Sequence, residues 1–309
     1  MKRIVSVSIG SSKRDSHIET EILGEKFTIK RIGTDGSIKK AIALIEALDG
    51  KVDALGMGGI DLYLWGGNRR YTIREALPLK RAAKATPVVD GSGLKNTLER
   101  KVIKYLMENN IVNFQRNTTL ITCVLDRFGL AETISQYEGK ILIGDIIFCL
   151  GLDIPIYSLK HIQTIARWIA PIVCKLPFKM LYPVGDKQNK SIMSKLQKYY
   201  SEVDIIAGDF HYIKRYMPQS LEEKIIITNT VTAEDVLQLK ERGVALLITT
   251  TPRLVDRSFG TNVMEAMMVS IMREGKYKNY EEIIKALDLK PRIEYLQIPS
   301  DTQSQETIM

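Results

Sequence analysis

Cysteine, histidine and tryptophan are scarce in this chain, whose 309 residues include three cysteines, three histidines and two tryptophans. Cys123, Cys149 and Cys174 are odd in number and lie in apolar runs, which predicts buried thiols of a reducing compartment instead of a disulfide framework. No combination of histidine, cysteine and acidic residues has the spacing of zinc ligands. The sequence therefore predicts no metal site.

Long hydrophobic runs and a leader segment are also lacking. The longest apolar stretch, residues 141–156, contains Asp145 and Asp153 and is shorter than a helix that spans a bilayer. A strand begins at the N-terminus without a cleavable apolar segment, so we expect a cytoplasmic protein with no transmembrane segment. The apolar middle third favours buried core or a homodimer face over a membrane-surface helix or a lipid-like ligand pocket, because a dense Lys/Arg array is missing.

Charge is in excess on the positive side, with 44 Lys and Arg against 36 Asp and Glu and a net charge of +8. The cations are spread along the chain and interleaved with acids, so a nucleic-acid partner is not required. A small anionic metabolite or a nucleotide accounts for the charge, and so does a solvated lysine-rich surface. Both explanations stay open.

Two segments of similar pattern indicate the architecture. Residues 52–63 and 203–212 each form an apolar strand that runs into a Gly/Asp loop, and each is followed by a second strand with a polar end, at 86–93 and 225–230. A helix then begins in both halves. We predict an α/β fold of two Rossmann-like lobes, with mainly parallel sheets and a cleft between them, closed by C-terminal helices.

The predicted lobes are an N-terminal α/β lobe at 1–110 and a C-terminal Rossmann-like lobe at 111–260 with an apolar helical insert at 141–178. Closing helices and a frayed tail follow at 261–309. Periodicity and capping predict helices at 38–48, 73–85, 94–109, 186–200, 233–242, 262–273 and 280–287. Strands are expected at 4–9, 52–55, 88–89, 118–125, 179–183, 203–207, 221–228 and 244–249, with a hairpin at 21–32.

In the first lobe, Asp90 and Lys95 place a carboxylate and an ammonium at a strand-to-helix junction, which is typical of a general acid/base pair beside a polar ligand. Ser92 and Asn96 are the predicted substrate contacts of this segment. Helix capping by Asp90 or Ser92 is an equally good explanation.

Further predicted substrate contacts come from the glycine-bearing loops, whose backbone a ligand can approach closely. They are Ser11, Ser12, Lys13, Gly58, Gly59 and Asp61, together with Asn262, which is expected to face the cleft beside Glu265. Surface turns that merely need glycine are the alternative.

In the second lobe, Asp209 and His211 follow Gly208 at a predicted strand end, where a carboxylate could orient a titrating imidazole. A histidine that only satisfies a hydrogen bond is the alternative. The predicted cofactor contacts end neighbouring strands and are Gly208, Asn229, Thr230, Thr249, Thr250, Thr251 and Arg253. A β-propensity run that closes in a proline turn would explain the threonines equally.

Residues 5–15, 58–63 and 89–97 together resemble bacterial proteins labelled quinate or shikimate 5-dehydrogenase. The resemblance implies a two-domain α/β enzyme that carries out an NAD(P)-linked oxidation of a cyclic polyol acid, with a Lys and an Asp as the catalytic pair.

We therefore expect an oxidoreductase that uses NAD or NADP and acts on a small anionic, cyclic hydroxy-acid-like metabolite. Two alternatives stay open: a transferase with a phosphorylated or sugar-nucleotide donor, and a non-catalytic ligand-binding or regulatory protein.

Overall fold

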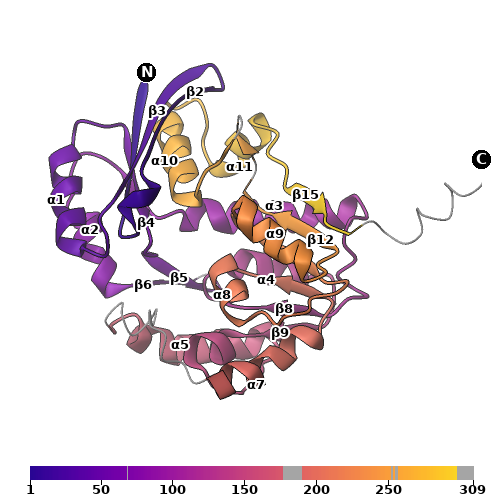
Figure 1. The fold of residues 1–309 in the computed structure, drawn as a ribbon. Coiled ribbons are helices and arrows are strands. Elements are labelled where there is room, and N and C mark those ends of the chain that lie inside the picture. The colour runs from indigo at the N-terminus through magenta and orange to yellow at the C-terminus, as the bar shows by residue number, and fades with distance from the viewer. Residues whose placement is uncertain (68, 177–189, 252, 255–256, 298–309) are drawn as a thin grey trace, which may run out of the picture. The chain divides into compact units, whose positions relative to one another are not determined.

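A computed structural model describes residues 1–67, 69–176, 190–251, 253–254 and 257–297, without the side chains of 190–195, 253–254 and 257–258. The chain divides into two compact units (Figure 1). Unit 1 comprises residues 1–101, 165–181 and 253–289, and unit 2 comprises 102–164, 182–252 and 290–309. The predicted strand at 179–183, the start of the predicted helix at 186–200 and the tail from residue 299 lie outside the described residues.

Unit 1 contains a five-stranded sheet in the order β2-β3-β1-β4-β7. Its strands are β1 (Lys2–Ser8), β2 (Ser16–Ile22), β3 (Glu25–Gly33), β4 (Ala54–Gly58) and β7 (Val88–Val89). All pairs are parallel except β2 with β3, which form the predicted hairpin around Gly24 at φ 77°. The C-terminal ends of β1, β3, β4 and β7 therefore meet at one edge, the carboxyl edge of unit 1.

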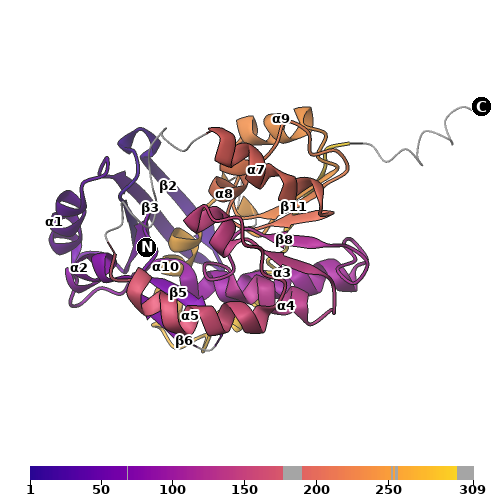
Figure 2. The same cartoon turned by 90° about the horizontal axis from the view of Figure 1, so that it is seen from below.

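The helices of this part of the chain are α1 (Ile38–Leu48), α2 (Leu77–Arg81), α3 (Ser92–Glu108), α10 (Thr261–Met272) and α11 (Tyr280–Ala286). Helix α1 has the predicted bounds, because Ser37 caps it and its buried stripe includes Ala41 and Ile45. Helix α10 packs against β4 and β1 (Figure 2). A small hairpin, β5 (Tyr63–Gly66) with β6 (Arg69–Thr72), was not predicted.

The helix predicted at 73–85 is wrong in length. A single 3₁₀ turn, η2 (Arg74–Ala76), leads into α2, which ends at Arg81. The Asp49 carboxylate accepts the N–H groups of Lys84, Ala85 and Thr86 at 2.7, 3.0 and 2.8 Å. These contacts hold residues 84–86 as a loop that leads into β7. The helix therefore cannot continue through them.

Unit 2 contains a six-stranded sheet in the order β15-β12-β11-β10-β8-β9. Its strands are β8 (Thr119–Ile121), β9 (Ile141–Ile143), β10 (Ile205–Ala207), β11 (Ile225–Thr228), β12 (Leu246–Thr249) and β15 (Arg292–Tyr295). Only β15 runs antiparallel to its neighbour. Both units thus have the predicted α/β architecture with mainly parallel sheets, and the five parallel strands define a carboxyl edge of unit 2.

The helices that follow these strands are α4 (Phe128–Ser135), α7 (Lys190–Ser201), α8 (Phe210–Tyr216) and α9 (Ala233–Glu241), with α5 (Leu159–Val173) crossing from unit 2 into unit 1. The apolar stretch predicted as the start of a helical insert begins instead as the edge strand β9, because Ile141–Ile143 are buried and pair with β8. A π-helical turn, η3 (Asp145–Cys149), follows. Among the described residues, no helix is long and apolar enough to cross a membrane.

Candidate functional site

A group of hydrogen-bonded polar side chains lies at the carboxyl edge of unit 2. Asp209 follows β10, Asn229 follows β11, and Arg127 ends the loop after β8. Arg127 Nη2 donates to Asp209 Oδ2 at 2.9 Å, and Asn229 Nδ2 donates to the same oxygen at 2.7 Å. Arg127 Nε also lies 3.5 Å from the carboxylate of Asp126. We call Asp126, Arg127, Asp209 and Asn229 the unit 2 cluster.

Backbone groups also take part in this cluster. Asp209 caps α8, with its Oδ1 accepting the backbone N–H of His211 at 2.9 Å. Asn229 Oδ1 accepts the N–H of Phe210 at 3.1 Å. The predicted pairing of Asp209 with His211 is therefore made through the backbone of the histidine, whose side chain is exposed.

Gly208 allows the loops after β8 and β10 to approach one another. Its φ is 146°, and a Cβ atom at this position would overlap Thr122 Oγ1. Only glycine fits both the conformation and the space. The predicted importance of glycine here thus has a packing reason beside any contact with a ligand.

The predicted threonines lie at the same carboxyl edge of unit 2, at the ends of β11 and β12. Thr230 Oγ1 and Thr251 Oγ1 are 3.0 Å apart, and Thr251 Oγ1 donates to the Asn229 carbonyl at 3.1 Å. Thr249 and Thr250 are buried, with the Thr250 N–H donating to the Thr228 carbonyl. The side chain of Arg253, which begins the two-residue strand β13 (Arg253–Leu254), lies outside the description.

Sequence reasoning missed the part that Asp126, Arg127 and Asp145 play. Asp145 begins η3 and accepts the N–H groups of Val124 and Leu125 at 2.7 and 3.0 Å, which fixes the loop that carries Asp126 and Arg127. Burial raises the pKa of Asp145 to about 6. The sequence signal that could have identified Asp145 is a carboxylate placed inside an apolar run.

Two thiols adjoin this acid. Cys123 Sγ lies 3.6 Å from Asp145 Oδ1 and 3.7 Å from Cys149 Sγ. Its hydrogen bond with Cys149 and its burial raise the pKa of Cys123 well above the usual range, so the thiol stays protonated. Cys123 is therefore not poised as a nucleophile.

In unit 1, Asp90 acts as an anchor. Its Oδ2 accepts the N–H groups of Leu62 and Tyr63 at 2.7 and 3.3 Å, and its Oδ1 accepts the N–H and the hydroxyl of Ser92 at 3.1 and 2.7 Å. The carboxylate holds the loop after β4 against the start of α3. This geometry is that of a structural cap, the alternative that the sequence left open.

Lys95 and Asn96 lie on the first turns of α3. The buried Lys95 Nζ is 3.7 Å from Asp61 Oδ1, which joins α3 to the loop after β4. Asn96 Oδ1 is buried without a hydrogen-bond partner. The structure therefore brings four predicted residues together at this edge, namely Asp61, Asp90, Ser92 and Lys95.

Glu265 of α10 is buried at the same junction. Its Oε2 accepts the Gly91 N–H at 2.5 Å, and its Oε1 accepts the Tyr280 hydroxyl at 2.7 Å. Burial raises the pKa of Glu265 to about 7. One helical turn away, Asn262 Nδ2 donates to Ser6 Oγ at 2.8 Å, so the start of α10 is held on β1.

The predicted loops after β1 and β4 also meet, since a Cβ atom on Gly59 would lie 3.2 Å from the Gly10 nitrogen and Gly58 lies against Ser8. However, Ser12 N–H donates to Asp35 and Lys13 N–H donates to Ser11 Oγ. Protein acceptors thus already use the amides that would hold an anion, and Ser11, Ser12 and Lys13 are exposed.

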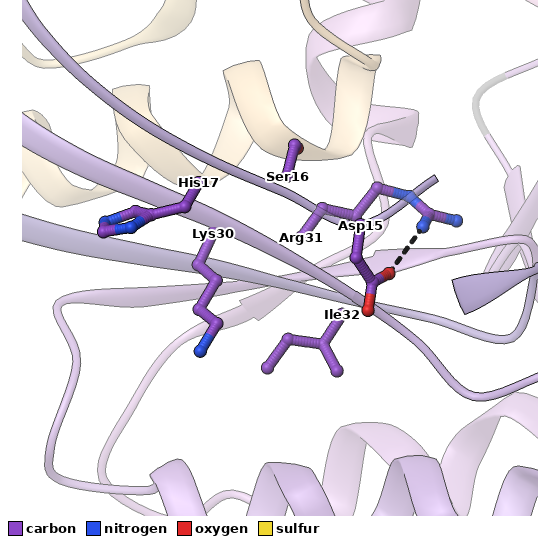
Figure 3. Close-up of a pocket in the computed structure, with 6 residues that line it drawn as sticks. All are labelled: Asp15, Ser16, His17, Lys30, Arg31 and Ile32. Atoms are coloured by element: carbon purple, nitrogen blue, oxygen red, sulfur yellow. Dashed lines mark hydrogen bonds and ion pairs between the residues drawn. The ribbon is translucent and has the colours of Figure 1, made fainter. Parts of the chain in front are cut away.

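A surface hollow of about 400 Å³ lies elsewhere on unit 1, on the β2–β3 hairpin. Figure 3 shows its lining, in which Asp15 pairs with Arg31 at 3.1 Å while His17 and Lys30 extend beside them. One hairpin supplies the whole lining, and no predicted site residue belongs to it. Among the residues that the structure describes, no group of three or more His, Cys, Asp and Glu could hold a metal ion.

Several solved structures are similar to the chain. A transporter solute-binding protein from Agrobacterium vitis with bound allitol shares 12% identity, 98% coverage of both chains and a TM-score of 0.44. The glucose-galactose binding protein GanP from Geobacillus stearothermophilus shares 11% identity, with 96% of this chain and 99% of that chain covered and a TM-score of 0.40. A periplasmic solute-binding protein from Actinobacillus succinogenes with bound D-allose shares 9% identity, with 96% and 98% covered and a TM-score of 0.40.

The resemblance to quinate or shikimate 5-dehydrogenases is wrong, and with it the assignment as an oxidoreductase that binds NAD or NADP. The three solved structures named above are binding proteins, two of them with allitol or D-allose bound, and none of them is named as a dehydrogenase. A physical reason lies in the loop after β8, where a dinucleotide fold offers backbone amides to the pyrophosphate. Here Val124 and Leu125 donate these amides to Asp145, whose carboxylate would repel a phosphate.

Family models match both parts of the chain, whereas a search of curated proteins found no match. Residues 3–90 match the model described as "Domain of unknown function (DUF8753)". Residues 93–296, more than half of the chain, match a second model, and the chain therefore belongs to the family described as "Domain of unknown function (DUF8754)".

Proposed function

We propose that the chain is a non-catalytic binding protein for a small, uncharged metabolite rich in hydroxyl groups, which the unit 2 cluster holds. The observation that carries the proposal is the pair of hydrogen bonds by which Arg127 and Asn229 fix the Asp209 carboxylate, at 2.9 and 2.7 Å. The Asp209 carboxylate and the Asn229 amide, held in fixed positions, supply an acceptor and a donor, which is what hydroxyl groups require, while the buried Arg127 orients them.

The charge of the cluster favours an uncharged ligand. Arg127 faces two carboxylates, those of Asp126 and Asp209, so its positive charge is already compensated. Lys214, on the next helix, pairs with Asp235 at 2.6 Å. A phosphorylated or carboxylated ligand would be repelled by the net negative charge of the unit 2 cluster. This disfavours both the anionic metabolite and the transferase with a phosphorylated donor.

The surroundings of Asp90 and Cys123 favour binding over catalysis. Asp90 accepts four hydrogen bonds from groups of its own unit, and Cys123 is a protonated, buried thiol. A general base or nucleophile must instead be free to reach a substrate atom. The roles predicted for Gly58, Gly59, Asn96 and Asn262 in contacting a ligand stay predictions.

Isothermal titration calorimetry and thermal unfolding with a panel of sugars, polyols, sugar phosphates and NADH test the proposal. We expect an uncharged sugar or polyol to bind and to stabilise the protein by about 2.7 kcal/mol at roughly one hundred times its Kd. The Asp209→Asn and Asn229→Ala variants should abolish the shift.

Asp204→Asn is the matched control, because Asp204 is an exposed carboxylate just before the opposite end of β10, where it accepts the Thr118 N–H. Its variant should bind like the parent chain. Binding of sugar phosphates alone, or equal loss of binding in Asp204→Asn and Asp209→Asn, would contradict the proposal.

A further inference from the structure

Helix α5 carries large apolar side chains on its exposed side. Trp168 is 77% exposed and Ile172 is 64% exposed, one helical turn apart, and Ile169 between them is also exposed. The opposite side of the helix is buried through Ala166 and Ala170. Exposed apolar clusters of this kind mark surfaces that bind a membrane or another protein.

Cations flank this apolar side: the sequence disfavours a membrane-surface helix because they are few, but the structure exposes all three of those at 160, 167 and 175. Residues 159–173 contain no Asp or Glu, and Lys160, Arg167 and Lys175 are exposed. The backbone N–H of Arg74, another exposed cation, donates to the Cys174 carbonyl at 2.8 Å. This bond ties η2 to the end of α5, beside which the β5–β6 hairpin lies in Figures 1 and 2.

The charge decides between three kinds of occupant. A second copy of the chain would bring two surfaces of the same positive charge together, because α5 carries Arg167 but no acidic residue, and like charges would oppose pairing. A nucleic acid would neutralise the cations but would leave Ile172 in water. A membrane with anionic lipids satisfies both features, since tryptophan settles at the interface, aliphatic side chains enter the acyl region and cations meet phosphates.

We propose that the exposed side of α5 and the turn that follows it, with Arg167, Trp168, Ile172 and Lys175, is a docking surface for membranes that contain anionic lipids. Trp168 and Ile172 enter the headgroup boundary, while Arg167 and Lys175 contact lipid phosphates. The proposal is independent of the ligand at the unit 2 cluster, because it uses none of the residues of that cluster.

Fluorescence gives a direct test, because the chain has only two tryptophans, Trp65 and Trp168. In a Trp65→Phe variant the emission comes from Trp168 alone. We expect this emission to shift to the blue on addition of phosphatidylglycerol/phosphatidylcholine vesicles, and the shift to weaken with added salt. Pure phosphatidylcholine vesicles should give a much smaller shift.

Co-sedimentation with the same vesicles separates the contribution of the apolar side chains from that of the cations. Trp168→Ser and Ile172→Ser should each lower the partition coefficient, and Arg167→Glu should lower it by about tenfold. Leu237→Ser is the matched control, because Leu237 on α9 is likewise 61% exposed. Circular dichroism of each variant verifies that it folds.

Three results would overturn the proposal. The first is an absence of binding to anionic vesicles, and the second is equal loss of binding in Trp168→Ser and Leu237→Ser. The third is a parent chain that forms a dimer by light scattering, together with a Trp168→Ser variant that is a monomer. This result would show that the surface binds a second copy of the chain.

Discussion

Arg127 Nη2 donates to Asp209 Oδ2 at 2.9 Å and so joins the loop after β8 to the loop after β10. The Arg127 side chain is only 2% exposed, whereas that of Asp209 is 19% exposed. The buried cation thus orients a carboxylate that reaches the surface. This division of roles is what a preformed binding site needs, because the oriented group loses little freedom when a ligand arrives.

Arg127→Met should destabilise unit 2 strongly, because it leaves the carboxylates of Asp126 and Asp209 near one another without their cation. Breaking a buried pair in this way costs about 3 kcal/mol. Urea unfolding of Arg127→Met, Asp209→Asn and the double variant measures this, and the double variant should recover part of the loss.

The exposed pair of Lys198 with Asp153, at 2.9 Å, provides the comparison. Both side chains are about half exposed, so Lys198→Met should change the free energy of unfolding by less than about 1 kcal/mol. Equal effects of Lys198→Met and Arg127→Met would show that burial of the arginine pair contributes nothing.

The free energy of unfolding should fall as the pH rises, because Glu265 ionises in the folded chain. Burial raises its pKa from 4.5 to about 7 in the folded chain, so the folded state binds more protons than the unfolded state between these values. The stabilising contribution is complete below pH 4.5 and is lost above pH 7, a change of about 3 kcal/mol.

Glu265→Gln should remove most of this slope, because the amide can still accept from Gly91 and donate to Tyr280 without ionising. Free energies of unfolding measured from pH 5 to pH 8 provide the test. The slope that remains below pH 6 belongs to Asp145, whose pKa is also raised. A parent chain that gains stability as the pH rises would contradict this account.

The parts of the fold that depend on local pattern were predictable. Helix α1 has its own cap and amphipathic stripe, so its bounds follow from residues 37–48 alone. The short α2 depends on Asp49, which lies some 35 residues away from the amides it accepts. The strand β15 has no apolar run and exists because it pairs with β12 at a sheet edge.

The same distinction holds for the candidate site. Asp209 and Asn229 were found because polar residues at the ends of parallel strands share an edge, and the structure joins them. Arg127 was missed because its role appears only when the loop after β8 meets the one after β10. Asp90 accepts four hydrogen bonds at the strand-to-helix junction, which is the geometry of the capping alternative, and its catalytic role stays a prediction.

Only Cys149 should react with a thiol reagent at neutral pH in the folded chain. Burial raises the pKa of Cys174 to about 11, and that of Cys123 lies well above its usual range, so both thiols are protonated and enclosed. Titration with a chromogenic disulfide should detect one fast thiol, which Cys149→Ser removes. A second fast thiol that Cys123→Ser removes would show that the loop after β8 is open in solution.

Gly208→Ala should destabilise unit 2, and a second substitution should partly repair it. The added Cβ would overlap Thr122 Oγ1, a buried hydroxyl without a hydrogen-bond partner, and φ 146° adds backbone strain. Thr122→Ala removes the overlap with Oγ1 but leaves a tight contact of 3.2 Å with the Cβ atom of residue 122 and the backbone strain. The double variant should therefore be more stable than Gly208→Ala by urea unfolding. Gly36→Ala, with φ 84° and open space around the glycine, serves as a reference for a positive-φ glycine without an overlap, and it should cost about 1 kcal/mol. If Thr122→Ala fails to rescue Gly208→Ala, the close approach of these two loops is wrong.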